Sequence, residues 1–156
     1  MEMKDEELKL GAKIDDLFLN LLEIIWEDIA GAYVSSETTS FNVTEHYLIE
    51  FLGKKGSASM SALCRIFHVV PTTMTSIVDR LVRKGYLKRS HSEEDRRVVL
   101  VRLSEQGERY HQRHRSESIQ MFSNLLHRLP DNGKNFYESL KGLNQSLLYL
   151  RKKYRQ

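Results

Sequence analysis

Residues 71–103, PTTMTSIVDRLVRKGYLKRSHSEEDRRVVLVRL, contain a segment of helix length followed by two segments of strand length. Pro71 stands where proline is favoured, in the first turn of a helix. Gly85 stands where glycine commonly ends one. Between them, apolar residues recur at helical spacing: Met74, Ile77, Val78, Leu81 and Val82. This pattern predicts an amphipathic helix that packs on one face and ends at Gly85.

Two segments of strand length follow Gly85 and are joined by a charged connection. Residues 86–90 and 98–103 alternate or run apolar, and the connection 91–97 reads HSEEDRR. Such a pattern predicts an antiparallel hairpin with Arg96 and Arg97 near its tip.

A second short helix is predicted before the first. Ser59 is placed to cap a helix through Phe67, with Leu63, Ile66 and Phe67 on its inner face, and residues 68–70 form the turn to Pro71. Two short helices followed by a charged hairpin form a winged helix-turn-helix. The expected fold class is therefore mainly α with a small β-hairpin wing.

Longer helices are predicted on both sides of this motif. Apolar residues at helical spacing run to about Tyr33, Thr44 is predicted to cap a helix carrying Tyr47, Leu48, Phe51 and Leu52, and Ser104 is predicted to begin a helix to about Leu129. After residues 130–133, a last helix carries an apolar seam with alternating spacings of four and three, which is typical of a helix facing another helix. The seam consists of Phe136, Leu140, Leu143, Leu147, Leu150 and Tyr154.

Charge is distributed unevenly along the chain. Residues 1–30 hold nine acidic residues against three lysines, a net charge of −6, whereas residues 71–102 hold eight basic residues against four acidic ones, a net charge of +4. A basic centre beside an acidic end is typical of a domain with a nucleic-acid surface on one side.

Several functional classes are disfavoured by composition and motifs. One cysteine allows neither an intrachain disulfide nor a multi-cysteine zinc site. We find no secretory signal and no apolar run of membrane-spanning length, so we expect a cytoplasmic protein without a membrane partner. The sequence has no G-x-S-x-G, P-loop or H-E-x-x-H motif, and we expect no enzymatic activity.

The predicted second helix and the hairpin supply the side chains that DNA contacts require. Short hydroxyls allow close approach to base edges and phosphates, and arginine suits guanine, a phosphate or a narrow minor groove. Asp95 is placed to hold an arginine side chain by a bidentate pair. The simpler interpretations are helix-capping hydroxyls and a solvated charged turn. The predicted DNA-binding residues are Thr72, Thr73, Thr75, Ser76, Arg80, Asp95, Arg96 and Arg97.

Residues 44–110 resemble the core of the MarR family of transcriptional regulators. The resemblance rests on the recognition helix VPTTMTSIVDRL at 70–81, the segment KGYL at 84–87, the wing DRR at 95–97 and LSEQG at 103–107. It implies a homodimer that binds double-stranded DNA at a pseudo-palindromic operator, commonly as a repressor. It further implies that Arg97 enters the minor groove, that Asp95 braces it and that Arg96 contacts a phosphate.

The same resemblance implies an organisation within one overall domain. Residues 1–34 would form an N-terminal dimerisation helix, 44–103 the winged helix-turn-helix DNA-binding lobe, and 104–156 the C-terminal dimerisation helices. Members of the family commonly respond to a small-molecule or metal effector in the cleft beside the DNA-binding lobe.

The sequence offers three kinds of effector site. Aromatic residues could line a ligand pocket, although aromatics at helical spacing usually belong to the core; they are Trp26, Tyr33, Phe41, Tyr47 and Phe51. Cys64 could sense oxidants but more simply packs as a small apolar residue. No resident cofactor is expected apart from zinc.

The zinc alternative rests on histidines near two helices. Glu45, His46, His111 and His114 are suitable ligand types. Resemblance to zinc-sensing members of the family implies that His46 and His114 join an acidic residue of the first helix, for which Asp28 is the nearest match. Those relatives carry a further histidine where this chain has Ser118. The remaining alternative is a winged-helix protein-interaction module without DNA binding.

Overall fold

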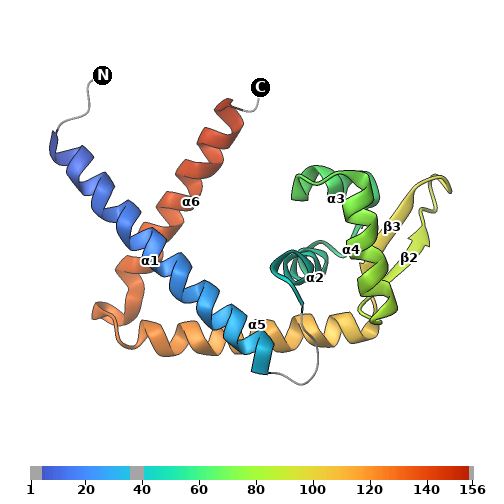
Figure 1. Ribbon diagram of the computed structural model, residues 1–156. Helices are drawn as coiled ribbons and strands as arrows, with labels where there is room; N and C mark the ends of the chain where they lie inside the picture. The colour runs from blue at the N-terminus through green and yellow to red at the C-terminus, as the bar shows by residue number, and fades with distance from the viewer. Residues whose placement is uncertain (1–4, 36–40, 155–156) are drawn as a thin grey trace. The chain divides into compact units, whose positions relative to one another are not determined.

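The computed structural model describes the backbone of residues 5–35 and 41–154 and the side chains of residues 6–21, 23 and 41–153. The chain divides into two compact units, Met1–Leu48 and Ile49–Gln156. Figure 1 shows the elements in chain order. They are α1 (Asp5–Ser35), α2 (Val43–Lys55), β1 (Ser57–Ser59), α3 (Met60–Phe67), α4 (Pro71–Arg83), β2 (Leu87–His91), β3 (Val99–Leu103), α5 (Glu105–Leu126), the 3-10 turn η1 (Pro130–Gly133) and α6 (Lys134–Tyr154). The expected fold class is confirmed.

The sheet has three antiparallel strands in the order β1-β3-β2. In the predicted hairpin, Leu87 pairs with Leu103 and His91 with Val99, whereas β1 pairs Ser57 with Arg102. The prediction of two strands is therefore incomplete. Strand β1 is only three residues of sequence SAS, which is too short and too polar to give an alternating pattern.

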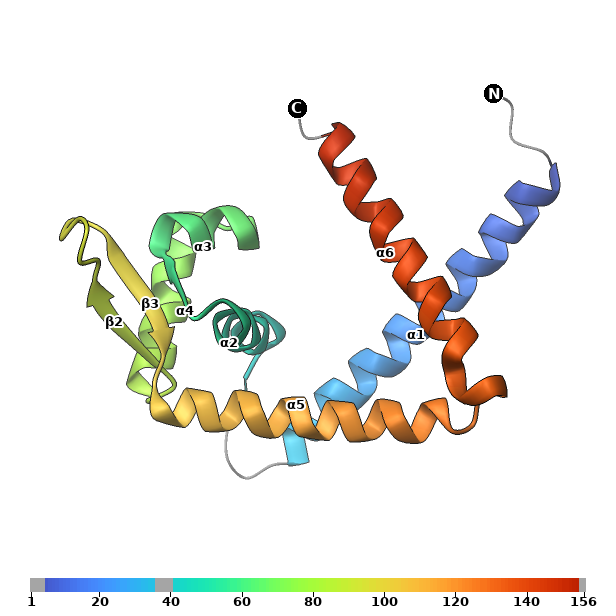
Figure 2. The ribbon, with the colours of Figure 1, turned by 180° about the vertical axis from the view of Figure 1, so that it is seen from behind.

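The core of the second unit lies between α3, α4 and the sheet, which the two ribbon views show side by side (Figures 1 and 2). The predicted inner face of α4 is confirmed for Met74, Ile77, Val78 and Leu81. On α3 only Leu63 is buried, and the prediction for Ile66 is wrong because its side chain is 47% exposed. The other buried apolar residues of this unit are Ile49, Leu52, Tyr86, Leu87, Val101 and Leu103.

The predicted helix starts are partly confirmed. Ser59 is the N-cap of α3, and its hydroxyl accepts a hydrogen bond from the Ala62 amide at 3.2 Å. In α2, Asn42 caps the helix instead of Thr44, because the Asn42 side chain accepts from the Glu45 amide and the Glu45 carboxylate accepts from the Asn42 amide. This reciprocal pair is a capping box with asparagine in the first position. Tyr47, which was predicted to lie on this helix, is exposed.

The start of α5 is tied to the turn that follows α4. Ser104 caps α5 by accepting from the Gly107 amide at 3.1 Å, its hydroxyl donates to the Gly85 carbonyl, and its amide donates to the Tyr86 carbonyl at 2.9 Å. A Cβ on the buried Gly107 would overlap the Tyr86 carbonyl oxygen. Glycine is therefore required where the two segments cross.

The later helices expose apolar side chains. The described seam residues of α6 are about half exposed, as are Ile119, Phe122 and Leu125 on α5. In α1, large apolar side chains are likewise exposed: Leu8, Leu10, Ile14, Leu17, Phe18, Leu19 and Leu21. In the part of the chain that the structure describes, no helix has the length and hydrophobicity needed to cross a membrane.

Candidate nucleic-acid interface

Helix α4 presents a polar face opposite its buried one. Every predicted contact residue on it is exposed: Thr72, Thr73, Thr75, Ser76 and Arg80. The helix begins at Pro71 after Val70, whose side chain provides no capping hydrogen bond. None of these hydroxyls is therefore the N-cap of α4. The first-turn amides of α4 are oriented to attract an anion, because the positive end of the helix dipole lies there.

An ion pair links α4 to the wing. The Arg89 guanidinium on β2 lies 2.6 Å from the Asp79 carboxylate on α4, and both side chains are only partly exposed. The pair connects the hairpin to the helix at the surface of the lobe. Asp79 also borders a shallow hollow on α4, lined by Ser76, Asp79, Val82 and Arg83. The sequence motifs identified neither partner, because an ion pair between a helix and a strand has no fixed spacing.

The wing tip is held by its own backbone. The Ser92 amide donates to the Val98 carbonyl and the Val98 amide donates to the Asp95 carbonyl, both at 2.9 Å. The Asp95 carboxylate accepts from the Arg97 amide at 2.9 Å. Among the described residues, no ion pair joins Asp95 to an arginine side chain, so the predicted bidentate pair is not formed. Asp95 instead braces the main chain at Arg97.

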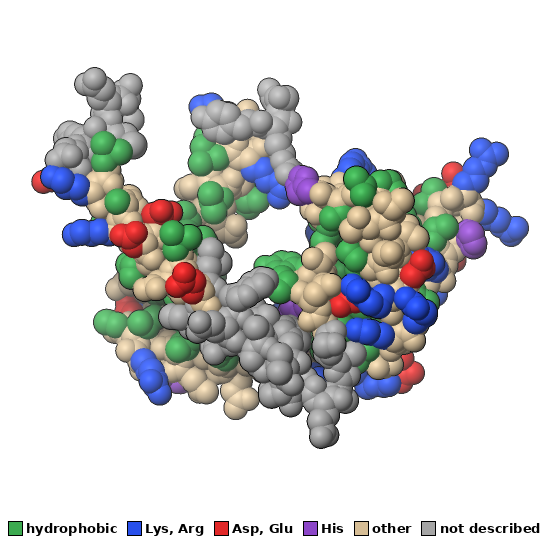
Figure 3. All heavy atoms as spheres, in the orientation of Figure 1, with side chains coloured by type: hydrophobic (Ala, Val, Ile, Leu, Met, Phe, Trp, Pro, Cys, Tyr) green, Lys and Arg blue, Asp and Glu red, His purple; other side chains and the backbone are tan. Residues whose placement is uncertain are grey.

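The arginines of the wing point into solvent. Arg96 and Arg97 are exposed, and Figure 3 shows Lys and Arg side chains projecting from the tip of the β2–β3 hairpin. The backbone position of such an arginine is held, while its exposed guanidinium keeps its capacity to donate hydrogen bonds. This arrangement suits contact with a phosphate or a groove.

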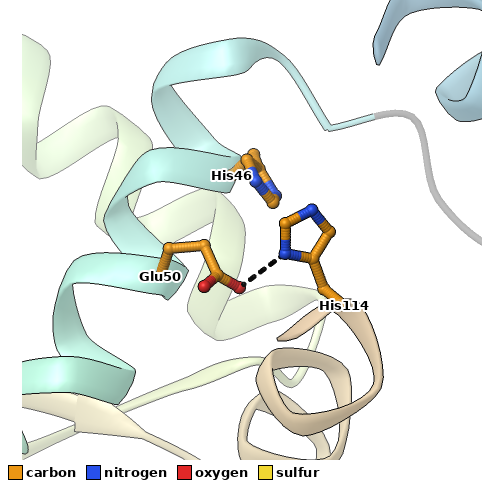
Figure 4. A group of neighbouring side chains, drawn as sticks. All are labelled: His46, Glu50 and His114. Atoms are coloured by element: carbon orange, nitrogen blue, oxygen red, sulfur yellow. Dashed lines mark ion pairs between the residues drawn. The ribbon is translucent and has the colours of Figure 1, made fainter. Parts of the chain in front are cut away.

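A second polar cluster involves α2 and α5. Glu50 on α2 contacts two histidines of α5: its carboxylate lies 2.9 Å from His111 Nδ1 and 3.3 Å from His114 Nδ1. His46 stands one turn before Glu50 on the continuous helix α2. Figure 4 shows His46, Glu50 and His114 as neighbouring side chains, and their potential ligand atoms lie within 4.8 Å of one another.

This cluster contains two of the predicted metal ligands, His46 and His114, and adds Glu50. Zinc binds histidine nitrogen and carboxylate oxygen at about 2.0–2.2 Å in tetrahedral geometry, so two ligand atoms on one ion lie about 3.4 Å apart. The donor types fit zinc, and side-chain rotations would have to bring the donor atoms closer together to complete the site. Sequence analysis missed Glu50, although its spacing of four from His46 on one helix could have indicated it. The side chain of the predicted ligand Asp28 lies outside the described residues.

The other proposed effector residues do not form a described pocket. Phe41 is buried, Tyr47 is exposed, and Phe51 packs edge-to-face against Phe67 with ring centroids 6.0 Å apart. Both rings are only partly buried, so this contact lies at the margin of the core. The side chains of Trp26 and Tyr33 lie outside the described part of the chain. Cys64 is half-buried on α3.

Comparison with known proteins gives matches over the same region. The sequence model of the MarR family matches residues 41–99. Two curated relatives come from Bacillus subtilis. The HTH-type transcriptional regulator YfiV is 29% identical over 64% of this chain and 63% of its own length. The HTH-type transcriptional repressor MdtR is 27% identical over 68% of this chain and 61% of its own length. The matches thus span less than two thirds of the length of these relatives.

Solved structures extend the similarity of the fold to most of the chain. A MarR family protein from Bacillus stearothermophilus superposes with a TM-score of 0.76 and 21% identity, covering 94% of this chain and 99% of its own. Streptococcus pneumoniae FabT, solved in complex with DNA, gives a TM-score of 0.71 and 24% identity over 94% of this chain and 98% of its own. These similarities support the winged-helix fold with its flanking helices.

Proposed function

We propose that the chain is a winged-helix transcriptional regulator of the MarR family, whose sequence model matches residues 41–99, and that it binds a pseudo-palindromic operator in double-stranded DNA as a homodimer and represses transcription. The family is one of transcriptional regulators and not of enzymes. One observation carries the proposal: a hydroxyl-rich exposed face of α4 and an exposed arginine wing belong to one lobe, joined by the Arg89–Asp79 ion pair. This function places the protein in the cytoplasm.

Each recognition element has a role in the proposed complex. Helix α4 enters the major groove, where Thr72, Thr73, Thr75 and Ser76 approach bases and phosphates and Arg80 contacts a base or a phosphate. In the wing, Arg97 enters the minor groove and Arg96 contacts a phosphate, while Asp95 holds the wing backbone. The exposure of these residues supports the assignment.

The proposed dimer is built from residues 1–34 and 104–156. Exposed apolar side chains on α1, α5 and α6 support it, because burying such side chains against a second copy removes apolar surface from water. A two-fold dimer places two copies of α4 about one DNA turn, ~34 Å, apart, so that each copy contacts one half-site of the operator.

Repression is proposed by analogy with relatives described as repressors, MdtR and YetL. We further propose that a small effector releases the operator by favouring a dimer conformation in which the two copies of α4 have the wrong spacing.

The proposal is tested by fluorescence anisotropy with DNA from upstream of the coding sequence and with scrambled DNA of the same composition. We expect tight, sequence-dependent binding by two protomers, weakening with salt at a slope near −0.9 per phosphate contacted. In vitro transcription from the bound promoter should fall as protein is added.

A second set of duplexes, made from genomic fragments, tests for operators that lie elsewhere in the genome. Absence of salt-sensitive binding to both DNA sets would refute DNA binding and favour a winged-helix module that binds protein. Binding without a fall in transcription would leave DNA recognition standing and overturn repression.

Zinc responsiveness is a second candidate function, favoured by the group of His46, Glu50 and His114. Zinc would supply a cation there, and His111 would orient the carboxylate of Glu50 by donating to it, as histidine–carboxylate partners around zinc sites do. Metal bound to these residues would link α2 to α5. The proposed link joins the DNA-binding lobe to a dimerisation helix.

Calorimetry with zinc alone, on the metal-stripped full chain, tests this candidate. We expect His114→Ala and Glu50→Gln to weaken zinc binding at least tenfold, and His127→Ala, which removes an exposed histidine elsewhere on the chain, to leave it unchanged. Equal zinc affinity in all variants would refute the site. Operator affinity measured with and without zinc then decides whether the metal regulates DNA binding.

A further inference from the structure

His91, the last residue of β2, contacts the wing tip through its ring. Its Nδ1 lies 2.8 Å from the carbonyl oxygen of Arg96, five residues along the chain. The backbone at the same point is held by the Ser92–Val98 hydrogen bond, and Asp95 holds the next residue at the Arg97 amide. The carbonyl and the amide of the peptide that joins Arg96 to Arg97 are therefore both held by side chains of the wing.

The chemistry of this contact sets the state of the ring. A carbonyl oxygen only accepts hydrogen bonds, so Nδ1 of His91 must carry a proton and donate it. In the neutral ring this leaves Nε2 as an acceptor, and the tautomer is thereby selected by the wing itself. The ring is exposed and is outside the hydrophobic core, so its removal leaves the packing of the lobe unchanged.

We propose that His91 is a positioning residue of the wing, which orients the Arg96–Arg97 peptide through its Nδ1–H and so directs Arg97 toward DNA. The inference rests on the proposed DNA-binding function. In this proposal Arg97 contacts DNA, whereas His91 makes no DNA contact. His91 instead restricts the orientations that the Arg97 side chain can adopt.

The test compares four proteins against one operator: the parent, His91→Ala, His91→Asn and His91→Gln. Asparagine places an amide N–H near the position of Nδ1, whereas the glutamine amide reaches one bond further. We expect affinity to fall about threefold to tenfold in the alanine and glutamine variants, the range expected for loss of one hydrogen bond, and to stay within about twofold of the parent in the asparagine variant. Circular dichroism checks that all four remain folded.

Two further measurements separate positioning from direct contact. If His91 acts through Arg97, adding His91→Ala to Arg97→Ala weakens binding no further than Arg97→Ala alone. Long-range proton–nitrogen NMR of the DNA-free protein should show the Nδ1–H form of the His91 ring.

Several outcomes would overturn the inference. Parent-like affinity of His91→Ala, equal losses in the asparagine and alanine variants, or full additivity with Arg97→Ala would each do so, as would an Nε2–H ring in the free protein. If the parent itself binds no DNA, the proposed function fails, and the NMR result still decides whether the ring holds the wing.

Discussion

Arg97 has a fixed backbone and an exposed side chain. Its amide donates to the Asp95 carboxylate, and the neighbouring Val98 amide donates to the Asp95 carbonyl. Ordering a loop on binding costs conformational entropy, so a wing already ordered in the free protein loses less on binding. At the scale of single residues, we therefore expect Asp95 to contribute to affinity in the proposed complex although its charge repels phosphate.

The first prediction concerns Arg97→Ala. A well-placed arginine contact in a groove contributes about 1–3 kcal/mol, so operator affinity should fall roughly 5- to 150-fold. Anisotropy measures the change, and light scattering should show an unchanged dimer. The matched control is Arg115→Ala, which removes the same charge from an exposed position on α5. If the two variants bind operator equally well, the assignment of Arg97 to the DNA contact is wrong.

Gly107 is the second residue with a specific prediction. Because a Cβ there would overlap the Tyr86 carbonyl, a backbone atom that cannot rotate away, Gly107→Ala should lower the free energy of unfolding by about 1–3 kcal/mol. Urea denaturation measures it.

The control for this prediction is Gly142→Ala in α6. Among the described residues, nothing lies within 4 Å of a Cβ at Gly142. Alanine has the higher helix propensity, so this variant should be neutral or more stable by up to about 1 kcal/mol. A Gly107→Ala protein as stable as Gly142→Ala would show that the crossing at Tyr86 tolerates a side chain.

At the scale of elements, α6 carries an apolar seam that the described part of its own chain does not bury. Leu140, Leu143 and Leu147 are each more than 50% exposed. A helix with such a stripe packs against another helix, and in the proposed dimer that helix belongs in part to the second copy.

We therefore expect Leu147→Asp to weaken the dimer. Each buried leucine contributes about 1.5–3 kcal/mol and a two-fold interface contains the substitution twice, so dimer affinity should fall about 100-fold or more. Sedimentation across a concentration series measures it. Gln145→Asp introduces the same charge on the same helix, away from the seam. Equal dimerisation of both variants would exclude Leu147 from the interface.

The elements differ in how well sequence analysis predicts them. Helix α4 was predicted with its inner face because thirteen residues between Pro71 and Arg83 give several turns of periodic signal. Strand β1 gives no such signal, since its pairing partner β3 lies more than 40 residues away. The position of Glu50 beside His111 likewise depends on tertiary packing between α2 and α5, which local periodicity does not encode.

At the scale of the whole molecule, the proposed dimer sets the distance between its two DNA-binding lobes. Basic residues are concentrated in the 71–102 segment, and acidic residues in the first 30. Like charges repel, so the acidic helix of the dimer favours an orientation in which the wing segment meets the phosphates.

The distance between the two lobes predicts the spacing of the half-sites in the operator. Half-sites centred 10–10.5 base pairs apart lie on one face of the duplex, and five extra base pairs between them turn one half-site to the opposite face. Affinity for the lengthened operator should therefore fall about tenfold or more, to that of a single half-site. Unchanged affinity would mean that the two lobes bind DNA independently.

The close packing of Gly107 against Tyr86 also couples the start of α5 to the segment that follows α4. Two hydrogen bonds of Ser104 join the first turn of this 22-residue helix to the segment that follows α4, so we expect the two to move together. A helix of that length is about 33 Å long, and a tilt of about 5° at its far end moves the near end by about 3 Å. That displacement is close to the rise of one base pair. Small movements among the dimerisation helices would therefore suffice to shift α4 out of register with its half-site.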